Sequence, residues 1–285
     1  MNIKNAEIFI KQELNSLYNK LEIVSLTSII FQEILGLDKV KFLSDKELLL
    51  SNNQKQLLSS AISDLKNQKP IQYIVGNTEF FGSIFFVNKN VLIPRPETEE
   101  LVELFLKNEN LTSNHKIIDI GTGSGCISVS IAKNSKIQVF ATDISNEALN
   151  VAKKNAANNS ANVNFSIHDI LKNDIFQIEK ELFIFDFIIS NPPYVRKMEA
   201  QMMQKNVLNN EPHLALFVED DNPLIYYKAI ANFAKKSLKK GGKIYLEVNE
   251  YIADSTAEIF KTQIFCDVKI KNDIFDKKRF IVVIK

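Results

Sequence analysis

The second half of the chain alternates short apolar runs with longer amphipathic stretches, and this pattern limits the possible folds more than any other feature. The apolar runs, rich in Ile, Val and Phe, predict strands at residues 116–120, 137–142, 163–167, 185–190 and 243–248. Helices are expected at residues 125–134, 146–158, 222–239 and 250–260. Strands with few polar positions, separated by helices, are typical of a parallel sheet that is buried on both faces. The pattern therefore predicts a doubly wound α/β sheet.

Two more apolar runs, at residues 264–270 and 279–284, would bring this sheet to seven strands. Only residues 271–278 separate them, which is too short a segment for the crossover helix that parallel neighbours need. We therefore expect a mostly parallel seven-stranded sheet with an antiparallel pair at its edge.

The first 70 residues follow a different period. Their apolar residues recur every three or four positions, as in amphipathic helices. Gly36 predicts the end of one helix, and Ser44 with Glu47 predicts a capping box at the start of another. Nine Lys, no Arg and eight acids precede Pro70, so this part predicts a neutral helical bundle that packs or docks a partner.

Around Pro70 the period changes again. Residues 71–95 predict a β-hairpin linker, because β-branched and aromatic residues are punctuated by turn signals at 76–77, 82–83 and 88–90. Two prolines, Pro94 and Pro96, then end the strand, and the acids that follow suit the first turn of a helix. The predicted division is a helical domain at 1–70, the linker at 71–95 and the α/β domain at 96–285.

Composition and charge exclude several classes of protein. With 45% hydrophobic and 24% charged residues, the 285-residue chain is not a disordered one. Its 35 Lys and Arg nearly balance its 34 Asp and Glu, whereas a protein that holds nucleic acid by its phosphates normally has a clear basic excess. Cys126 and Cys266 have no metal-binding spacing and are expected to be reduced. The N-terminus lacks the apolar core of a signal peptide, and the longest apolar stretch, residues 182–189, is too short for a bilayer. We therefore expect a cytoplasmic protein with no metal, no membrane partner and no direct nucleic-acid partner.

A glycine-rich turn, Gly121-Thr122-Gly123-Ser124-Gly125, follows the first predicted strand of the sheet. Glycine is needed where a ligand approaches the backbone closely, although a purely structural turn can have the same composition. The spacing is neither the dinucleotide fingerprint nor a phosphate loop. Asp143 ends the next strand about 20 residues after Gly121, where an acid can bind the ribose hydroxyls of an adenosine ligand. Its alternative role as a helix N-cap has a competitor in Ser145. Together the turn and the acid predict a site for an adenosine-type cofactor.

The strand at 185–190 ends in Asn191-Pro192-Pro193-Tyr194, at the carboxyl edge where α/β sheets bind ligands. The prolines fix the backbone, so that Asn191 and neighbouring carbonyls can point into a cleft. Asn191 offers a carbonyl acceptor for an NH2 group, and Tyr194 offers a flat face for a planar group. The loop thus predicts a substrate with a planar nitrogen, either an amide or an exocyclic base amine. The alternative is a Pro-Pro loop that only ends a strand.

The order of the motifs GTGSG, ATD and NPPY resembles that of the S-adenosylmethionine-dependent amino-methyltransferases. A closer resemblance is to the peptide chain release factor glutamine methyltransferases (the PrmC/HemK family). It runs from about residue 70 to the C-terminus, and the helical N-terminal part is similar in length and place. The run VLIPRPETE is highly specific to this family, whereas NPPY is shared with adenine methyltransferases. The segments that carry the resemblance are residues 73–76, 80–82, 91–99, 119–126, 190–195 and 211–216.

The resemblance implies a role for each matched residue. Glu247 matches an acid of the family, whereas Asn249 stands where many relatives have Gly. Many relatives also have an aromatic residue in place of Ile170, so apolar contact with adenine is expected there rather than stacking. The cofactor would be bound by Gly121, Thr122, Gly123, Ser124 and Gly125 under its methionine part, by Asp143 at the ribose, by Asp169 and Ile170 at the adenine, and by Asn191. The substrate amide would be bound by Asn191, Pro192, Pro193 and Tyr194, of which Asn191, Pro192 and Tyr194 are the expected catalytic residues.

The resemblance also implies the reaction. A methyl group would pass from S-adenosyl-L-methionine, leaving S-adenosyl-L-homocysteine, to the side-chain amide nitrogen of the glutamine in the Gly-Gly-Gln motif of peptide chain release factors 1 and 2. This reaction belongs to translation termination, and we expect a monomer whose N-terminal helices recognise the substrate protein away from the glutamine. Because an amide nitrogen is a poor nucleophile, acceptors on its N–H bonds would provide the main catalytic effect. His115, His168 and His213 lie outside the motif and are expected to be structural or exposed.

Three alternatives remain open. A ribosomal-protein glutamine methyltransferase is the nearest. A DNA or RNA adenine methyltransferase would be expected to add a basic domain, but here the extra domain is neutral and only three Arg occur in the chain. A module that binds the cofactor without catalysis is disfavoured by the intact NPPY loop.

Overall fold

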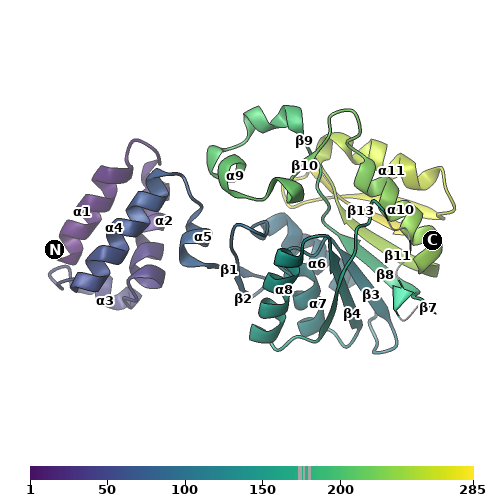
Figure 1. The fold of residues 1–285 in the computed structure, drawn as a ribbon, viewed down its shortest axis with the longest axis horizontal. Helices are drawn as coiled ribbons and strands as arrows, with labels where there is room; N and C mark the ends of the chain where they lie inside the picture. The colour runs from purple at the N-terminus through teal and green to yellow at the C-terminus, as the bar shows by residue number, and fades with distance from the viewer. Residues whose placement is uncertain (173–174, 176, 179–180) are drawn as a thin grey trace. The chain divides into compact units, whose positions relative to one another are not determined.

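The computed structural model describes residues 1–172, 175, 177–178 and 181–285 of the chain. These residues fold into two compact units (Figure 1). Unit 1 consists of residues 1–76 together with 204–210, and unit 2 of residues 77–203 together with 211–285. The chain therefore leaves unit 2 after Met203 and returns to it at Glu211.

Unit 2 is built on a seven-stranded sheet with the order β12-β13-β11-β8-β3-β4-β5. All neighbours from β11 to β5 are parallel, and β13 is antiparallel to both of its neighbours. This confirms the predicted doubly wound, mostly parallel sheet with an antiparallel edge. The strands are β3 (Lys116–Ile120), β4 (Gln138–Asp143), β5 (Val163–Ile167), β8 (Phe185–Ser190), β11 (Leu238–Glu247), β12 (Asp267–Asn272) and β13 (Lys278–Ile284).

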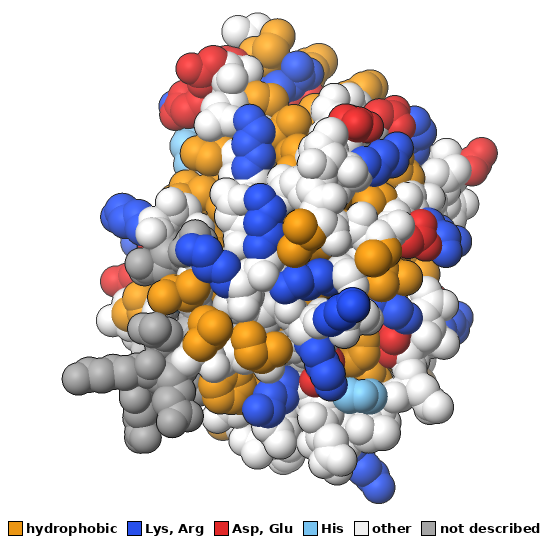
Figure 2. Space-filling model, turned by 90° about the vertical axis from the view of Figure 1, so that its right-hand side faces the viewer, with side chains coloured by type: hydrophobic (Ala, Val, Ile, Leu, Met, Phe, Trp, Pro, Cys, Tyr) orange, Lys and Arg blue, Asp and Glu red, His pale blue; other side chains and the backbone are white. Residues whose placement is uncertain are grey.

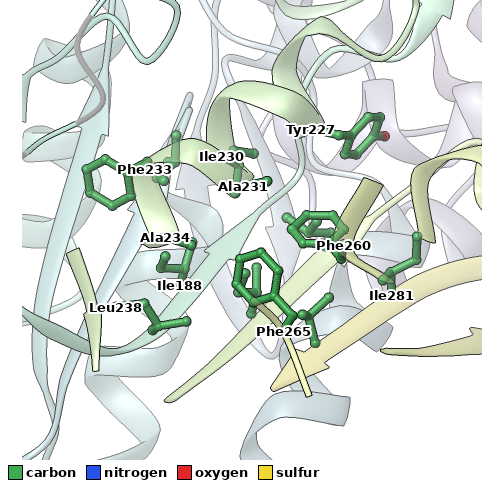
Figure 3. Packing of buried hydrophobic residues seen from close by; sticks show 14 of the residues in the cluster. Ile188, Tyr227, Ile230, Ala231, Phe233, Ala234, Leu238, Phe260, Phe265 and Ile281 are labelled. Carbon is green, nitrogen blue, oxygen red and sulfur yellow. The ribbon is translucent and has the colours of Figure 1, made fainter. Parts of the chain in front are cut away.

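Helices cover both faces of this sheet (Figure 1). On one face lie α6 (Pro96–Asn108), α7 (Cys126–Asn134) and α8 (Asn146–Asn158), and on the other lie α10 (Ile225–Ser237) and α11 (Ala253–Lys261). Successive residues of β3 serve the two faces, since Ile117 packs with α6 and α7 while Ile118 packs with α10 and α11. Figure 3 shows the hydrophobic core on the face covered by α10 and α11, where Phe233 of α10 and Phe260 of α11 are fully buried.

Short elements connect these layers. A hairpin of β1 (Asn77–Phe80) and β2 (Ser83–Phe86) precedes α6, and Asn155 of α8 bonds both backbone groups of Phe86. The remaining elements of unit 2 are β6 (Gln177–Ile178) paired with β7 (Glu181–Leu182), β9 (Val195–Arg196) paired with β10 (Phe217–Val218), and the 3-10 helices η2 (Lys197–Met202), η3 (His213–Ala215) and η4 (Glu250–Ile252).

Unit 1 is a helical bundle, as its period predicts. Its core holds Ile3, Ile10, Phe31 and Leu58, which are almost fully buried. Gly36 has a φ of +62° directly after the last helical turn of η1, which confirms the predicted stop. The helical elements are α1 (Ile3–Leu14), α2 (Lys20–Ile29), the π-helix η1 (Ile30–Ile34), α3 (Lys39–Ser44), α4 (Asn52–Lys66), α5 (Ile71–Val75) and α9 (Lys205–Asn210).

The capping box predicted at Ser44 and Glu47 is wrong. Ser44 ends α3, and the capping box of the next helix lies at Ser51 and Gln54, whose side chain and backbone groups bond reciprocally. Both serines stand three residues before a Glu or Gln, so the local pattern does not distinguish them.

The hairpin expected over residues 71–95 is shorter than predicted. Residues 71–75 form the helix α5, because Ile71 and Ile74, three positions apart, pack against the core of unit 1. Gly76, with a φ of +85°, ends that helix, and the hairpin then covers residues 77–86. Tertiary packing here overrides the β propensity of the local sequence.

The surface carries charged side chains of both signs as well as apolar side chains. The face shown in Figure 2 has many Lys and Arg side chains, with acidic and hydrophobic ones between them. A net charge of +1 therefore does not mean a neutral surface everywhere. Within the described part of the chain, no helix is both long enough and apolar enough to cross a membrane.

Candidate active site

Three loops of unit 2, together with other segments, line a cavity of about 460 Å³ at the carboxyl edge of the sheet. The loops follow β3, β4 and β8, and Ile120, Asp143 and Ser190 at the ends of these strands line the cavity. Because carboxyl ends of parallel strands meet at one edge, residues far apart in the sequence come together here.

The glycine-rich turn forms one wall of the cavity. Its glycines Gly121, Gly123 and Gly125 have φ values of +74°, +55° and +80°, which other residues rarely adopt. A Cβ at Gly121 or Gly123 would meet nothing within 4 Å, so a ligand can approach the backbone there. At Gly125 a Cβ would lie 3.1 Å from the Cβ of Ala152 in α8, so this glycine allows the close packing of that helix. Its predicted contact with the cofactor stays a prediction.

The buried carboxyl group of Asp119 holds the start of this turn through hydrogen bonds. The Thr122 hydroxyl donates to Oδ2 of Asp119 at 2.6 Å, and its oxygen lies 2.9 Å from that of Ser128. Burial raises the pKa of the Asp119 carboxyl to about 7, because the charged form loses its hydration. Asp119 therefore holds the start of the turn in place.

Asp143 lies at the cavity with both carboxyl oxygens engaged. Oδ2 accepts from the amide of Gly123 at 2.9 Å, and Oδ1 accepts from the amide of Ser145 at 2.9 Å. The N-cap of α8 is Ser145, whose hydroxyl oxygen accepts from the amide of Ala148. Asp143 is therefore not the helix cap, and it lines the cavity with lone pairs that can accept further hydrogen bonds.

The end of the cavity beyond β5 is lined by apolar, aromatic and charged residues. Asp169, Ile170 and Tyr226 line it together, and Oδ1 of Asp169 accepts from the amide of Leu171 at 3.0 Å. Burial raises the pKa of the Tyr226 phenol, and the nearby Asp169 and Asp143 charges raise it further. Tyr226 was not predicted from the sequence, where its only signal was an aromatic residue near the start of the helix predicted at 222–239.

The NPPY loop forms the opposite wall. The Ser190 hydroxyl donates to the carbonyl of Ile120 at 2.6 Å and ties the end of β8 to the end of β3. Asn191, Pro192 and Pro193 line the cavity. The Asn191 side-chain nitrogen donates to the Thr98 hydroxyl oxygen at 3.0 Å, so the side-chain oxygen remains available as an acceptor.

Tyr194 is directed to a different partner. Its hydroxyl donates to Oε1 of Glu247 at 3.0 Å, and it is not among the described residues that line the cavity. Burial and the nearby Glu247 charge raise the pKa of the Tyr194 phenol well above its ordinary value. The predicted contact of Tyr194 with the substrate stays a prediction.

Glu247, at the end of β11, connects these side chains. Its Oε2 accepts from the Thr98 hydroxyl at 2.7 Å, and it is 1% exposed. Burial raises the pKa of the Glu247 carboxyl to about 6. The sequence matched this acid to the family but gave it no role, and Thr98 was missed because only its place in the VLIPRPETE run marked it.

An ion pair joins two further segments of the cavity wall. Arg95 bonds Oε1 of Glu211 at 2.5 Å, and the amide of Ile93 donates to Oε2 of the same carboxylate at 3.1 Å. Glu211 is 4% exposed, and the neighbours Pro94 and Pro212 line the cavity. This pair fixes the IPRP segment against the segment that follows Glu211.

Family models match both parts of the chain. Residues 96–219 match the model described as "Methyltransferase small domain", and residues 16–76 match "PrmC N-terminal domain". Among solved structures, a methyltransferase from Pyrococcus furiosus aligns with a TM-score of 0.52 at 20% identity, over 80% of this chain and 98% of that one. At this identity the likeness shows the fold alone.

Two curated relatives are similar over nearly their whole length. A "Release factor glutamine methyltransferase" of Flavobacterium psychrophilum is 44% identical over 99% of this chain and 99% of the relative. One of the same name from Bacteroides thetaiotaomicron is 40% identical over 96% of each. The predicted resemblance is thereby confirmed: the chain belongs to the release factor glutamine methyltransferase family.

Proposed function

We propose that this protein transfers a methyl group from S-adenosyl-L-methionine to the side-chain amide nitrogen of the glutamine in the Gly-Gly-Gln motif of peptide chain release factors. One observation supports this proposal most strongly. The Asn191 amide lies at the wall of the cavity with its nitrogen committed to Thr98, which leaves its oxygen to accept a hydrogen bond. A substrate amide NH2 group is a donor that such an acceptor can hold.

The cavity residues fit the cofactor. The open backbone at Gly121 and Gly123 suits the methionine part, and Asp143 suits the ribose hydroxyls. Ile170 and Tyr226 offer apolar faces to the adenine, with Asp169 beside them. When bound, the cofactor supplies an electrophilic methyl group on a sulfonium, and S-adenosyl-L-homocysteine is the product.

The contribution of the protein is to position and polarise the substrate amide. Its nitrogen is a poor nucleophile because the lone pair is delocalised into the carbonyl. The Asn191 oxygen and the Pro192 carbonyl accept hydrogen bonds from the two N–H groups, which holds the nitrogen in line and increases its electron density as the bond to carbon forms. Pro193 keeps this loop rigid, and Tyr194 packs against the substrate. After transfer the positively charged amide nitrogen loses one proton to water.

Unit 1 has the task of recognising the substrate protein away from the glutamine. Whole release factor should then have a lower KM than a short peptide containing Gly-Gly-Gln, with a similar kcat. Equal KM values would contradict this task.

Release factors 1 and 2 are the protein partners, the enzyme acts as a monomer in the cytoplasm, and it binds no nucleic acid directly.

One assay tests the function as a whole. Purified protein and radiolabelled S-adenosyl-L-methionine are offered to a release factor, to its Gln→Ala variant and to DNA. Label should enter only the unaltered factor. Label on DNA would favour an adenine methyltransferase, and equal label on the Gln→Ala variant would contradict the proposed acceptor.

The role of Asn191 has its own test. Asn191→Ala should lower kcat by on the order of 100-fold, if the loss of one acceptor resembles the loss of one oxyanion-hole donor. Unchanged turnover in this variant would refute the role.

A further inference from the structure

We infer that Thr98 and Glu247 are positioning residues that set the orientation of the Asn191 amide, so that the site presents a hydrogen-bond acceptor to the substrate nitrogen. This inference rests on the proposed function, because the orientation matters only for a substrate that donates. It assigns a task to two buried polar side chains that lie outside the NPPY loop.

The contacts form a chain that begins at the end of β11. The Thr98 hydroxyl, in the first turn of α6, donates to Oε2 of Glu247 at 2.7 Å. The Asn191 side-chain nitrogen donates to the same hydroxyl oxygen at 3.0 Å. Thr98 is 3% exposed and Glu247 is 1% exposed, so water competes little for these bonds.

The Glu247 carboxylate decides the direction in which each hydrogen bond in this series is donated. An ionised carboxylate can only accept hydrogen bonds, and a hydroxyl has a single hydrogen to donate. Thr98 gives that hydrogen to Glu247 and can then only accept from Asn191. The Asn191 amide must therefore turn its nitrogen toward Thr98 and its oxygen away from it.

The opposite orientation would disable the site. With the amide turned by 180°, two oxygens would face each other at Thr98, and the Asn191 NH2 group would meet the NH2 group of the substrate. Neither pair can form a hydrogen bond. A buried donor or acceptor without a partner is costly, so the flipped state is a minor one in the intact protein.

The same carboxylate also fixes the other end of the loop. Oε1 of Glu247 accepts from the Tyr194 hydroxyl at 3.0 Å, so one side chain orients both Asn191 and Tyr194. The positive charge of Arg279 lowers the pKa of the Glu247 carboxyl, and the negative charge of Glu97 raises it. The charge of Arg279 opposes the effect of burial, which favours the ionised, acceptor-only form on which the polarity depends.

Two substitutions at one position test the chain of contacts. Thr98→Val keeps the shape and removes the hydroxyl, whereas Thr98→Ser keeps the hydroxyl and removes a methyl group. We expect Thr98→Val to lower kcat roughly tenfold, since one hydrogen bond of ordinary strength sets the orientation. The KM for the cofactor should change little, and Thr98→Ser should restore most of the rate. A Thr98→Ser enzyme as slow as Thr98→Val would overturn the inference.

A double-mutant cycle separates positioning from general structural damage. In an Asn191→Ala background there is no amide to orient, so adding Thr98→Val should cost less than about twofold in single-turnover rate. If the tenfold loss persists in that background, Thr98 acts by some other route and the inference is wrong. Glu247→Gln provides an independent test, because glutamine can donate to Thr98 and so permits both orientations. Its kcat should fall by at least about twofold, because two orientations of similar free energy leave only about half of the molecules productive. An unchanged kcat would contradict the polarity assigned to the carboxylate.

A measurement without methyl transfer keeps this inference separate from the proposed function. The NMR signals of the Asn191 side-chain NH2 group can be assigned from their loss in Asn191→Ala. One of its protons should exchange slowly with water in the unaltered protein and in Thr98→Ser, and rapidly in Thr98→Val. Equal exchange in all three would overturn the inference even if release factor is methylated. Failure of the unaltered enzyme to methylate release factor would instead refute the proposed function.

Discussion

Replacing Gly125 by alanine tests the two separate uses that the chain makes of glycine in one turn. Gly125 has a φ of +80°, and a Cβ there would lie 3.1 Å from the Cβ and 3.2 Å from the Cα of Ala152. Gly121 has a similar φ of +74°, but a Cβ there would meet nothing within 4 Å. The pair Gly125→Ala and Gly121→Ala therefore shares the backbone strain and differs in the steric contact.

The magnitudes follow from these two effects. An alanine in the left-handed region costs about 1–2 kcal/mol. The stiffer unfolded chain returns about 0.4–1 kcal/mol of this. Gly121→Ala should thus lose about 1 kcal/mol of unfolding free energy. Overpacking against α8 adds about 1–3 kcal/mol for Gly125→Ala. We therefore expect Gly125→Ala to be less stable than Gly121→Ala by about 1–3 kcal/mol.

Amide hydrogen exchange of β3, followed by mass spectrometry, measures this difference within unit 2 itself. The chain has no Trp, so fluorescence gives no comparable local signal. A difference of about 1–3 kcal/mol corresponds to exchange about 5 to 150 times faster in Gly125→Ala. Affinity for the cofactor should instead be weaker in Gly121→Ala than in Gly125→Ala, because Gly121 lines the cavity and Gly125 does not. Equal exchange rates, or the weaker cofactor binding in Gly125→Ala, would refute the assignment.

Three further predictions concern other buried polar groups and a helix cap. Burial raises the pKa of Asp119 from 3.8 to about 7, so the folded chain retains a proton that the unfolded chain releases. The stability of the protein relative to Asp119→Asn should fall as the pH rises from 3.8 to about 7 and then stay level, and parallel Tm curves for the two proteins would contradict this. Arg95→Met leaves the buried Glu211 carboxylate without its ion pair and should cost about 1–3 kcal/mol in urea unfolding, whereas Arg95→Lys should cost less; equal losses would argue against the pair. Ser51→Ala removes the cap of α4 and should lower the stability of unit 1 by about 1 kcal/mol without changing kcat. Hydrogen exchange of the α4 amides measures the stability, and the methylation assay measures kcat.

The local pattern of the sequence was sufficient to predict the seven-stranded sheet of unit 2 and the main helices that cover it. The predicted strands at 116–120, 163–167 and 185–190 coincide with β3, β5 and β8, and the predicted helix at 146–158 coincides with α8. Strands that are apolar on both faces and glycines at a strand end are properties of neighbouring residues, so a single sequence reveals them. The antiparallel edge could also be predicted from neighbouring residues, because the connection between its two strands is too short for a crossover helix.

The N-terminal part shows where local patterns fail. Ser44 and Ser51 both precede an acceptor by three residues, and only packing of the helices decides which serine caps one. Residues 71–75 have strand propensity but become helical because Ile71 and Ile74 reach the core of unit 1. Propensities that differ by fractions of a kcal/mol per residue yield to the burial of whole side chains.

The sequence by itself thus determined the fold class, the edge of the sheet that forms the site, and the candidate residues on the loops after β3, β4 and β8. Only the tertiary structure decided which side chains hold those residues in place. Thr98 and Asn191 are 93 residues apart, Thr98 and Glu247 are 149 apart, and Arg95 and Glu211 are 116 apart. Contacts over such separations leave no periodic signal, because they depend on the order in which the strands pair and on the crossings that bring distant chain segments to one edge. Most residues proposed to touch the ligands could be predicted from motifs, although Tyr226 could not. The buried groups that orient them appeared only once the sheet was assembled.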